Sequence, residues 1–368
     1  MPSRGHRGSA RPTLADVAAA AGVSRTTASR ALSDEPNVSA AARARVWSAA
    51  QRLQFEPNHL ARSLRRGRTM GVGVVVPHFV NLFYAAAVHG AQEVLEAAGY
   101  HVLILNSQRS ASRERAALRS LRAHQVDGLI VATCGGYEDI GVPTAFFDDV
   151  PADVGVGGIA LDNERGIALL VEHLVQEHGH RRIAYIGHPA ASTDGPTPQV
   201  FVGRERLEAF RAAAGGAGLA LPPELIRLAE PSAPADVLRA AASQLLALDE
   251  PPSAVVAGTD TLALGVMDAM RAAALRAPED VAVVSFDEPV HPDLLDPPMT
   301  SLGRHDRELG ARAAEMLLRA LTAPDDTAAP TLVRVPLELR VRRSCGCGGP
   351  EDASATRQAL RGRRQPAS

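Results

Sequence analysis

The stretch LADVAAAAGVSRTTASRAL, residues 14–32, decides the N-terminal fold because it holds two short helical segments on either side of a glycine. Thr13 precedes the first segment and can cap it. Gly22 permits a tight turn, and Ser24 stands where it can cap a second helix. The apolar residues of the first segment recur at helical spacing; they are Leu14, Val17, Ala18 and Ala21.

A third periodic segment, SAAARARVWSAAQRL, covers residues 39–53 and begins with Ser39 as a cap. Three short helices around one small core, the second beginning just after a glycine turn, are typical of a helix-turn-helix unit. An alanine-rich helical hairpin with solvated arginines is the alternative. The apolar stripe of this third helix consists of Ala42, Val46, Ala49, Ala50 and Leu53.

The second helix begins with side chains suited to DNA. Arg25, Thr26 and Thr27 fill its first turn, and Ser29 and Arg30 follow. In a major groove the N-terminal residues of such a helix face base edges, where an arginine fork matches guanine O6 and N7. Hydroxyl groups suit phosphates.

A basic segment, FEPNHLARSLRRGRT, follows at residues 55–69. Pro57 can begin a helix, and Leu60 and Leu64 share one of its faces. Because the segment is too short to be a stable lone helix, we expect it to fold only in a minor groove that takes up its leucine and arginines. A plain basic linker is the alternative. Its arginines are Arg62, Arg65, Arg66 and Arg68.

Residues 13–69 resemble the head and hinge of the LacI/GalR family of bacterial transcription regulators, through DVAAAAGVSRTTASRAL, NVSAAARARV and PNHLARSL. The resemblance implies that Arg25 and Thr26 read bases, with Arg30 as the arginine typical of that helix. It also implies that Leu64 inserts into the central step of the operator. The implied phosphate-contacting or capping residues are Ser24, Thr27, Ser29 and Asn58.

The charge is unevenly distributed although the formal net charge is only −2. Residues 1–69 carry 12 arginines against 4 acids, whereas residues 70–349 carry 23 arginines against 35 acids. A cationic head on an acidic body indicates a polyanionic partner for the head alone. The three cysteines make no disulfide framework, no apolar run could span a membrane, and no secretory signal is present, so we expect a cytoplasmic protein.

From Met70 the pattern changes to alternating strands and helices, which predicts parallel, doubly wound sheets. Residues 70–343 again resemble the LacI/GalR family, whose core is similar to periplasmic sugar-binding proteins. The resemblance implies two α/β lobes joined by three crossovers, formed by residues 70–161 plus 304–331 and by residues 162–303 plus 332–343. The remaining predicted parts are a disordered basic arm at 1–12, a helix-turn-helix head at 13–56, a hinge helix or linker at 57–69 and a disordered tail at 344–368.

A ligand is expected between the lobes, at the carboxyl ends of the strands. Carboxylates and an arginine fork can hold hydroxyl groups, and an aromatic ring can stack on a sugar or base. An N-cap or an interlobe ion pair is the alternative role of each charged residue. Residues 225–236 contain no aromatic residue to serve as a stacking platform, so the effector stays open between sugar-like and nucleoside-like molecules. The candidate effector residues are Phe83, Tyr84, Asp148, Arg206, Asp260 and Asp287.

Other signals predict no further chemistry. His173, His178 and His180 surround a predicted helix end, where capping is the expected role. Cys345 and Cys347 lack the second ligand pair of a zinc site. We therefore expect no metal and no cofactor, and the absence of a catalytic motif argues against an enzyme.

The sequence therefore predicts a homodimeric, ligand-responsive transcription regulator, a repressor, that binds a pseudo-palindromic DNA operator and no membrane. It is expected in the bacterial cytoplasm, associated with the nucleoid when bound. A solute-binding protein of a transport system is the alternative, but the cationic head and the absence of an export signal argue against it. An enzyme on the same lobes is a second alternative.

Overall fold

The computed structural model describes residues 12–33, 37–55, 68–151, 157–189, 202–303, 305–322 and 332–348. It divides into two compact units, Met1–Gly71 and Val72–Ser368. Three residues of the predicted hinge, Asn58, Arg62 and Leu64, lie outside the described residues.

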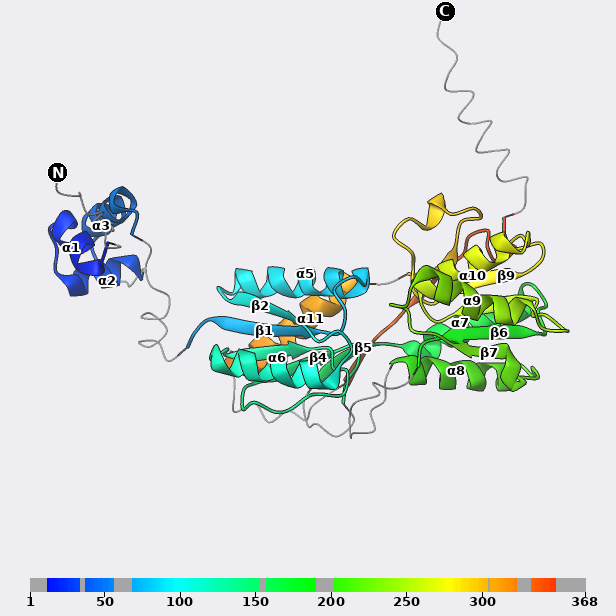
Figure 1. The fold of residues 1–368 in the computed structure, drawn as a ribbon. Helices are drawn as coiled ribbons and strands as arrows, with labels where there is room; N and C mark the ends of the chain where they lie inside the picture. The colour runs from blue at the N-terminus through cyan, green and yellow to red at the C-terminus, as the bar shows by residue number, and fades with distance from the viewer. Residues whose placement is uncertain are drawn as a thin grey trace, which may run out of the picture. The chain divides into compact units, whose positions relative to one another are not determined.

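The N-terminal unit contains three helices, α1 (Leu14–Ala21), α2 (Arg25–Leu32) and α3 (Ala40–Leu53) (Figure 1). Thr13 and Asp16 form a capping box at the start of α1, and Gly22 ends it in the left-handed region with φ 64°. The Thr27 amide donates to the Ser24 side chain, which caps α2. These local signals confirm the predicted helix-turn-helix unit.

Small side chains fill the interior of this unit, which lets three short helices approach closely. Its most deeply buried residues come from all three helices. They include Val17 and Ala18 of α1, Ala28 and Ala31 of α2, and Val46, Ala49 and Ala50 of α3.

The first lobe of the second unit contains a six-stranded sheet in the order β11-β5-β4-β3-β1-β2. The pairs β1–β3, β3–β4, β4–β5 and β5–β11 are parallel. Helices α5 and α6 lie on opposite sides of this sheet in Figure 1. The elements are β1 (Gly71–Val76), α5 (Leu82–Ala97), β2 (His101–Asn106), α6 (Ala111–Ala123), β3 (Gly128–Val131), β4 (Thr144–Phe147), β5 (Gly158–Leu161), α11 (Asp306–Thr322) and β11 (Leu332–Val335).

Helices α5 and α11 of this lobe touch backbone to backbone. A Cβ atom on Gly310 would overlap the carbonyl of Ala87, and one on Gly90 would overlap the carbonyl of Arg307. Glycine at both crossings is therefore required by the packing rather than by a turn.

The second lobe repeats the arrangement with a sheet in the order β12-β10-β9-β8-β6-β7. Only β12, paired with β10, is antiparallel among its described pairs. The two sheets confirm the predicted two-lobed α/β core. Its elements are α7 (Asn163–Gln176), β6 (Ile183–Gly187), α8 (Val202–Gly216), η1 (Pro223–Leu225), β7 (Ile226–Leu228), α9 (Ala235–Leu246), β8 (Ala254–Ala257), α10 (Asp260–Ala272), β9 (Ala282–Ser285), η2 (Pro292–Leu294), β10 (Thr300–Gly303) and β12 (Glu338–Arg340).

The chain passes between the two sheets after β5, after β10 and between β11 and β12. The predicted second lobe began its last segment at residue 332, but β11 pairs in parallel with β5 of the first sheet. The last crossover therefore lies at residues 336–337, because only β12 joins the second sheet.

The predicted disordered tail also begins too early. Ser344 and Cys345 are buried. The Ser344 amide donates to the carbonyl of Pro298, and its own carbonyl accepts from the Val283 amide at 2.8 Å. These bonds hold residues 344–345 against the second sheet.

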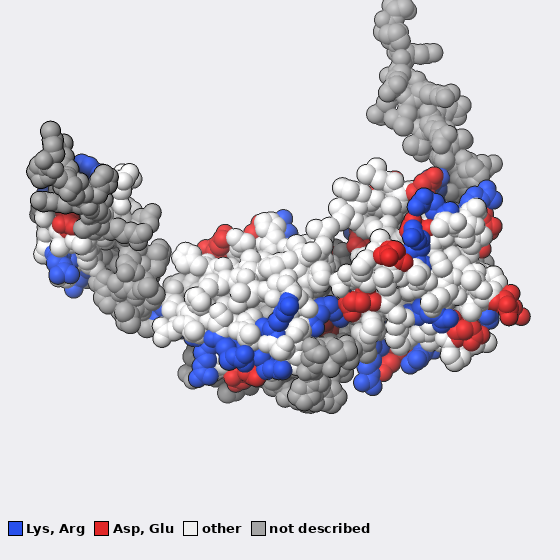
Figure 2. All heavy atoms as spheres, viewed as in Figure 1, with Lys and Arg blue, Asp and Glu red and all other residues white. Residues whose placement is uncertain are grey.

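The visible surface of the second lobe mixes arginines with acidic side chains (Figure 2). In the part of the chain that the structure describes, no helix combines the length and the apolar character needed to cross a membrane.

Candidate functional site

The exposed side of α2 carries most of the residues predicted to contact DNA. Arg25, Thr26 and Arg30 are exposed, and Arg25 opens the helix. Ser24 and Thr27 are partly used within the protein, since their hydroxyl oxygens lie 2.8 Å apart while Ser24 caps the helix. The structure therefore leaves two arginines and one threonine of this helix pointing to solvent.

Ser29 departs from its predicted role. Its side chain is only 6% exposed, and its Oγ has no hydrogen-bond partner among the described residues. It follows Ala28 on the side of α2 that packs on the core, so a phosphate contact does not fit its position in this conformation.

The second candidate site is a cavity of about 380 Å³ in the core unit, lined by residues of both lobes. It lies at the carboxyl ends of the strands, where open α/β sheets bind small molecules. The first lobe lines it with the start of α5 and the residues after β2 and β4, and the second lobe with α8 and the residues after β6, β8 and β9. Five of the six predicted effector residues line it: Phe83, Tyr84, Asp148, Arg206 and Asp287.

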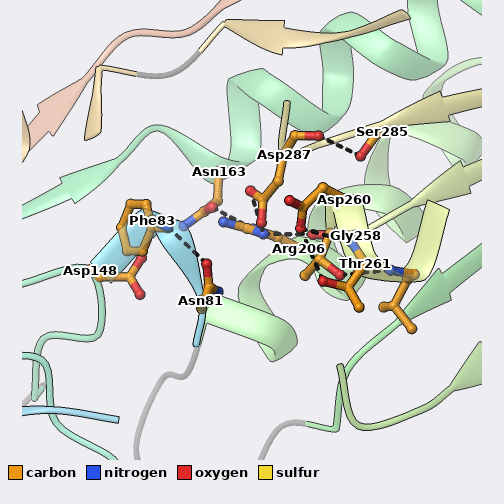
Figure 3. A network of polar contacts seen from close by, with 12 residues as sticks. Asn81, Phe83, Asp148, Asn163, Arg206, Gly258, Asp260, Thr261, Ser285 and Asp287 are labelled. Atoms are coloured by element: carbon orange, nitrogen blue, oxygen red, sulfur yellow. Dashed lines mark hydrogen bonds and ion pairs between the residues drawn. The ribbon is translucent and has the colours of Figure 1, made fainter. Parts of the chain in front are cut away.

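Arg206 of α8 is the most extensively bonded charged residue of this cavity (Figure 3). Its Nε donates to Asn163 Oδ1 at 2.9 Å, and its Nη1 donates to the Gly258 carbonyl at 2.6 Å. Nη1 also lies 3.3 Å from Asp287 Oδ1, and both side chains of this ion pair are nearly inaccessible. The guanidinium stacks 3.7 Å from the centre of the Phe286 ring.

This arrangement fixes the guanidinium plane before any ligand arrives. Nη2 of Arg206 has no hydrogen-bond partner within the described residues, and the residue lines the cavity. A positioned donor of this kind loses little side-chain entropy on binding a ligand oxygen. Arg206 therefore forms a buried ion pair and also lines the cavity.

Asp148, just after β4, faces Arg206 from the first lobe (Figure 3). The Tyr84 hydroxyl donates to Asp148 Oδ2 at 2.8 Å. Burial raises the pKa of Asp148, and burial beside this carboxyl group raises the pKa of Tyr84 well above its usual value. Asp148 also has φ 63°, a left-handed conformation that Asp tolerates better than most residues. The strained turn aims its carboxyl group at the cavity.

Asp260 is the one predicted effector residue that does not line the cavity. Its carboxylate accepts from the amide of Thr261 at 2.7 Å and from the Thr261 hydroxyl at 3.3 Å. Its carboxylate therefore bonds the first turn of its own helix, whose N-cap is Thr259. Its neighbours Thr259 and Thr261 reach the cavity instead.

Four further polar residues that line the cavity escaped the sequence reasoning. Arg109 has its Nε 3.0 Å from Glu230 Oε1, a contact between the lobes. The Val202 amide donates to Asp149 Oδ1 at 2.7 Å, which is a second interlobe contact. His188 follows β6 and is buried.

Burial controls the charge of two of these groups. Burial, and to a smaller extent the adjacent Asp148 carboxyl group, raise the pKa of Asp149 to about 8. Burial lowers the pKa of His188 to about 3, with Arg109 and Arg206 acting in the same direction. At neutral pH the imidazole is therefore neutral, and Asp149 is largely protonated.

A signal for three of these residues was present in the sequence. Asp149 adjoins a predicted strand-end residue, and Arg109 and His188 follow the strands HVLILNS and RRIAYIG. The expectation that ligand residues lie at the carboxyl ends of strands therefore applied to all three. Glu230 had no such signal. It belongs to residues 225–236, which contain no aromatic residue, and residues 230–233 of this segment line the cavity.

The charges of the described lining residues largely balance. Arg206 pairs with Asp287, and Arg109 pairs with Glu230. The two adjacent carboxyl groups after β4 have no such arginine partner within hydrogen-bonding distance in the described structure. Such a lining offers both hydrogen-bond donors and acceptors to hydroxyl groups of a ligand.

Two parts of the chain match known families. Residues 13–58 match the family described as bacterial regulatory proteins, lacI family. Residues 171–345 match the family described as periplasmic binding protein-like domain.

Individual proteins are similar to the chain over most of its length. The ribose operon repressor of Escherichia coli (strain K12) is 32% identical over 323 residues, which cover 85% of this chain and 94% of the repressor. The crystal structure of the lac repressor dimer bound to operator and the anti-inducer ONPF is 26% identical, with a TM-score of 0.78, covering 91% of this chain and 99% of that one. The complex of the transcriptional regulator CelR with cellobiose is 30% identical, with a TM-score of 0.64, covering 91% and 100%.

Proposed function

The chain belongs to the LacI family of bacterial regulatory proteins, and on this premise we propose that it is a cytoplasmic repressor whose operator affinity responds to a small molecule bound in the cavity. The observation that carries this proposal is the presence, in one chain, of an exposed basic helix and a cavity lined by residues of two lobes. A transport protein needs the cavity but has no use for the helix. The similar proteins named above are regulators rather than enzymes, and we propose no catalytic step.

The head is proposed to bind DNA through α2 in the major groove. Arg25 and Thr26 are at its exposed start, where a recognition helix meets base edges, and Arg30 is exposed one turn further on. A homodimer would present two such helices to a pseudo-palindromic operator. We assign Asn58, Arg62 and Leu64, which lie outside the described residues, to phosphate and minor-groove contacts of the hinge.

The effector is proposed to be a small neutral sugar. The cavity offers several carboxyl groups, the free Nη2 of Arg206 and the side chain of Asn81, a donor and acceptor mixture that suits hydroxyl groups. Its wall at residues 230–233 is Glu-Pro-Ser-Ala, which supplies no ring for a purine to stack on. The ribose operon repressor and the cellobiose complex of CelR are named for sugars, which agrees with this chemistry.

Coupling between the cavity and the head is proposed to use the interlobe contacts. The pairs Arg109–Glu230 and Asp149–Val202 join the lobes beside the bound ligand, so a ligand that prefers one lobe arrangement shifts that equilibrium. By linkage, the operator must then change ligand affinity by the same factor as the ligand changes operator affinity.

Operator binding tests the first part of the proposal. Full-length protein is titrated against fluorescent DNA from upstream of its own gene, at low and moderate salt. We expect a sequence-dependent complex that Leu64→Ala weakens without changing ligand affinity measured in the absence of DNA. Equal affinity for the upstream DNA and for a shuffled duplex would overturn the assignment as a sequence-specific regulator.

Ligand binding tests the second part through the melting temperature of the full chain, which a ligand of the folded state raises. Free pentoses, hexoses and disaccharides are compared with their phosphates, nucleosides and purines. We expect a free sugar to raise the melting temperature and Asp148→Asn to abolish that increase. Asn keeps an oxygen that can accept from Tyr84 and tolerates φ 63°, so the turn is retained.

Asp236→Asn is the matched control, because Asp236 is exposed on α9 and does not line the cavity. It should leave the sugar-induced increase unchanged. A larger increase with a sugar phosphate or a purine than with any free sugar would contradict the proposed ligand class, while leaving the DNA-binding result intact.

A further inference from the structure

Four potential metal ligands gather in the second lobe at a place that the regulatory function does not use. His173 and His178 come from the end of α7, and Cys345 and Cys347 come from the segment after β12. One ligand atom from each residue lies within 4.8 Å of each of the others. The histidine pair and the cysteine pair, about 170 residues apart in the sequence, thus lie in one cluster.

The distances in the cluster resemble those of a tetrahedral site. Nε2 of His173 lies 3.3 Å from Sγ of Cys345 and 3.7 Å from Sγ of Cys347, and Nε2 of His178 lies 3.2 Å from Sγ of Cys347. A tetrahedral zinc ion with usual bond lengths separates its nitrogen and sulfur ligands by about 3.6 Å. These three separations therefore differ from the tetrahedral value by only a few tenths of an ångström.

The cysteine segment is anchored on the second sheet without any metal. Ser344 Oγ donates to the Val283 carbonyl at 2.6 Å and accepts from the Thr300 amide at 2.8 Å, which anchors the residue before Cys345. Gly346 adopts φ 106°, and a Cβ there would lie 3.3 Å from the His178 ring. Glycine between the two cysteines thus supplies both the turn and the room for the imidazole.

We propose that His173, His178, Cys345 and Cys347 form a structural zinc site. Two imidazole nitrogens and two thiolates are a ligand set that selects zinc among common divalent ions. Four protein ligands leave no open position, so the ion would stabilise the fold rather than catalyse. The sequence pattern predicted no metal because each half, a histidine group and a Cys-Gly-Cys segment, looked incomplete alone.

The surroundings support ligand roles for these side chains. Cys345 is 1% exposed and His173 is 9% exposed, so this half of the site is shielded from water, whereas His178 and Cys347 are half-buried. The Thr300 hydroxyl donates to Cys345 Sγ at 3.1 Å, the kind of hydrogen bond that orients a thiolate ligand. His180 is excluded, because its Nδ1 bonds Ser253 Oγ at 2.9 Å and it is absent from the cluster.

A zinc ion here would fasten the C-terminal segment to the last turn of α7. The same helix begins at Asn163, which accepts a hydrogen bond from the cavity residue Arg206. The ion would therefore stabilise the C-terminal end of α7, while the N-terminal end of the same helix contacts Arg206. Binding would release the protons of both thiols, which makes affinity fall at acidic pH.

Metal content of the full-length protein tests the proposal. Reduced protein is stripped with a chelator, reloaded with zinc, desalted and measured by elemental mass spectrometry, and a parallel sample is loaded with cobalt(II). We expect one zinc per chain, a higher melting temperature with zinc, and the visible and near-ultraviolet bands of a tetrahedral cobalt–thiolate centre. His178→Ala and Cys347→Ser should each reduce the tightly bound zinc to background.

The matched controls are His180→Ala and Cys134→Ser, since these residues are the neighbouring histidine and the third cysteine outside the cluster. Both should retain one zinc per chain and the cobalt spectrum. The proposal is overturned by zinc uptake that is the same in all four variants, by cobalt bands without thiolate character, or by reduced wild-type protein that takes up no metal.

Discussion

The recognition helix α2 and the cavity place arginines in opposite surroundings. Arg25 is exposed at a helix start, whereas Arg206 is 4% exposed and bonded to Asn163, Gly258 and Asp287. The charge of Arg25 is solvated in the free protein, so its contribution is expected only when DNA is bound. The charge of Arg206 is already part of the fold, so function and stability cannot be separated there.

The comparison teaches that the two sites should respond differently to the same kind of substitution. In the head, binding should change while stability stays constant. In the core, stability should change first, and any loss of ligand binding has to be judged against it.

Arg206→Met should have the largest effect. It removes the partner of the buried Asp287 carboxylate, and breaking a buried pair in this way costs about 3–5 kcal/mol. Urea unfolding of the full chain measures the loss. Combining Arg206→Met with Asp287→Leu should recover part of it; if the single variant is as stable as wild type, the pair contributes nothing and the contrast with Arg25 fails.

Gly310→Ala should come next. The added Cβ would overlap the Ala87 carbonyl where α11 crosses α5, and overpacking of this kind costs about 1–3 kcal/mol or more. Gly22→Ala in the head is the matched comparison: nothing lies within 4 Å of its Cβ, so only the strain of φ 64° remains, about 1 kcal/mol. The two free energies of unfolding are read from urea titrations, and a larger loss for Gly22→Ala would reverse the expected order.

Arg25→Ala should leave the unfolding free energy within about 0.5 kcal/mol of wild type, because the side chain is exposed. Discrimination at one base pair of each half-site should fall by about 1–3 kcal/mol. Competition binding with operator variants measures this. Arg52→Ala, exposed at the end of α3, serves as control and should retain the full sequence preference. A uniform loss over all sequences would make Arg25 a phosphate contact instead.

The pH dependence of stability should change with a single buried carboxyl group. The pKa of Asp149 is raised to about 8 in the folded state from the ordinary value near 3.8, so the folded state holds a proton that the unfolded state has lost between these values. This contribution is complete below pH 3.8 and is lost as the pH rises to about 8.

Asp149→Asn should therefore reduce the fall in unfolding free energy with rising pH, by up to about 1.4 kcal/mol per pH unit for one proton. Urea titrations at a series of pH values measure the slope. His188 acts oppositely, since its pKa of about 3 removes stability as the pH falls below 6.5. An unchanged slope between pH 5 and 8 in Asp149→Asn would show that its carboxyl group is ionised in the folded protein.

The sequence predicted the head almost completely because its signals are local. A cap, a glycine turn and an apolar stripe each depend on residues within a few positions, and Thr13, Gly22 and Ser24 act as their types indicate. Ser29 is the exception. Helical spacing alone did not show that its hydroxyl turns toward the interior.

In the core, Arg206 was predicted from the start of a helix that follows a loop. The expectation of ligand residues at strand ends found Asp148 and Asp287. It also included Asp260, which bonds its own helix, and missed Glu230, which belongs to a loop. Which strand-end side chain faces the other lobe depends on packing between distant segments, and no local pattern carries that information.

The sequence by itself determined the order of helices and strands, the positive head, the acidic body and the two-lobed class of the core. Only the tertiary structure decided which carboxyl groups share the cavity, which sheet receives β11, and that two histidines meet two cysteines near the C-terminus. The physical reason is that capping, turns and hydrophobic periodicity act between neighbours in the chain, whereas ion pairs and metal ligands depend on distances that chain folding alone sets.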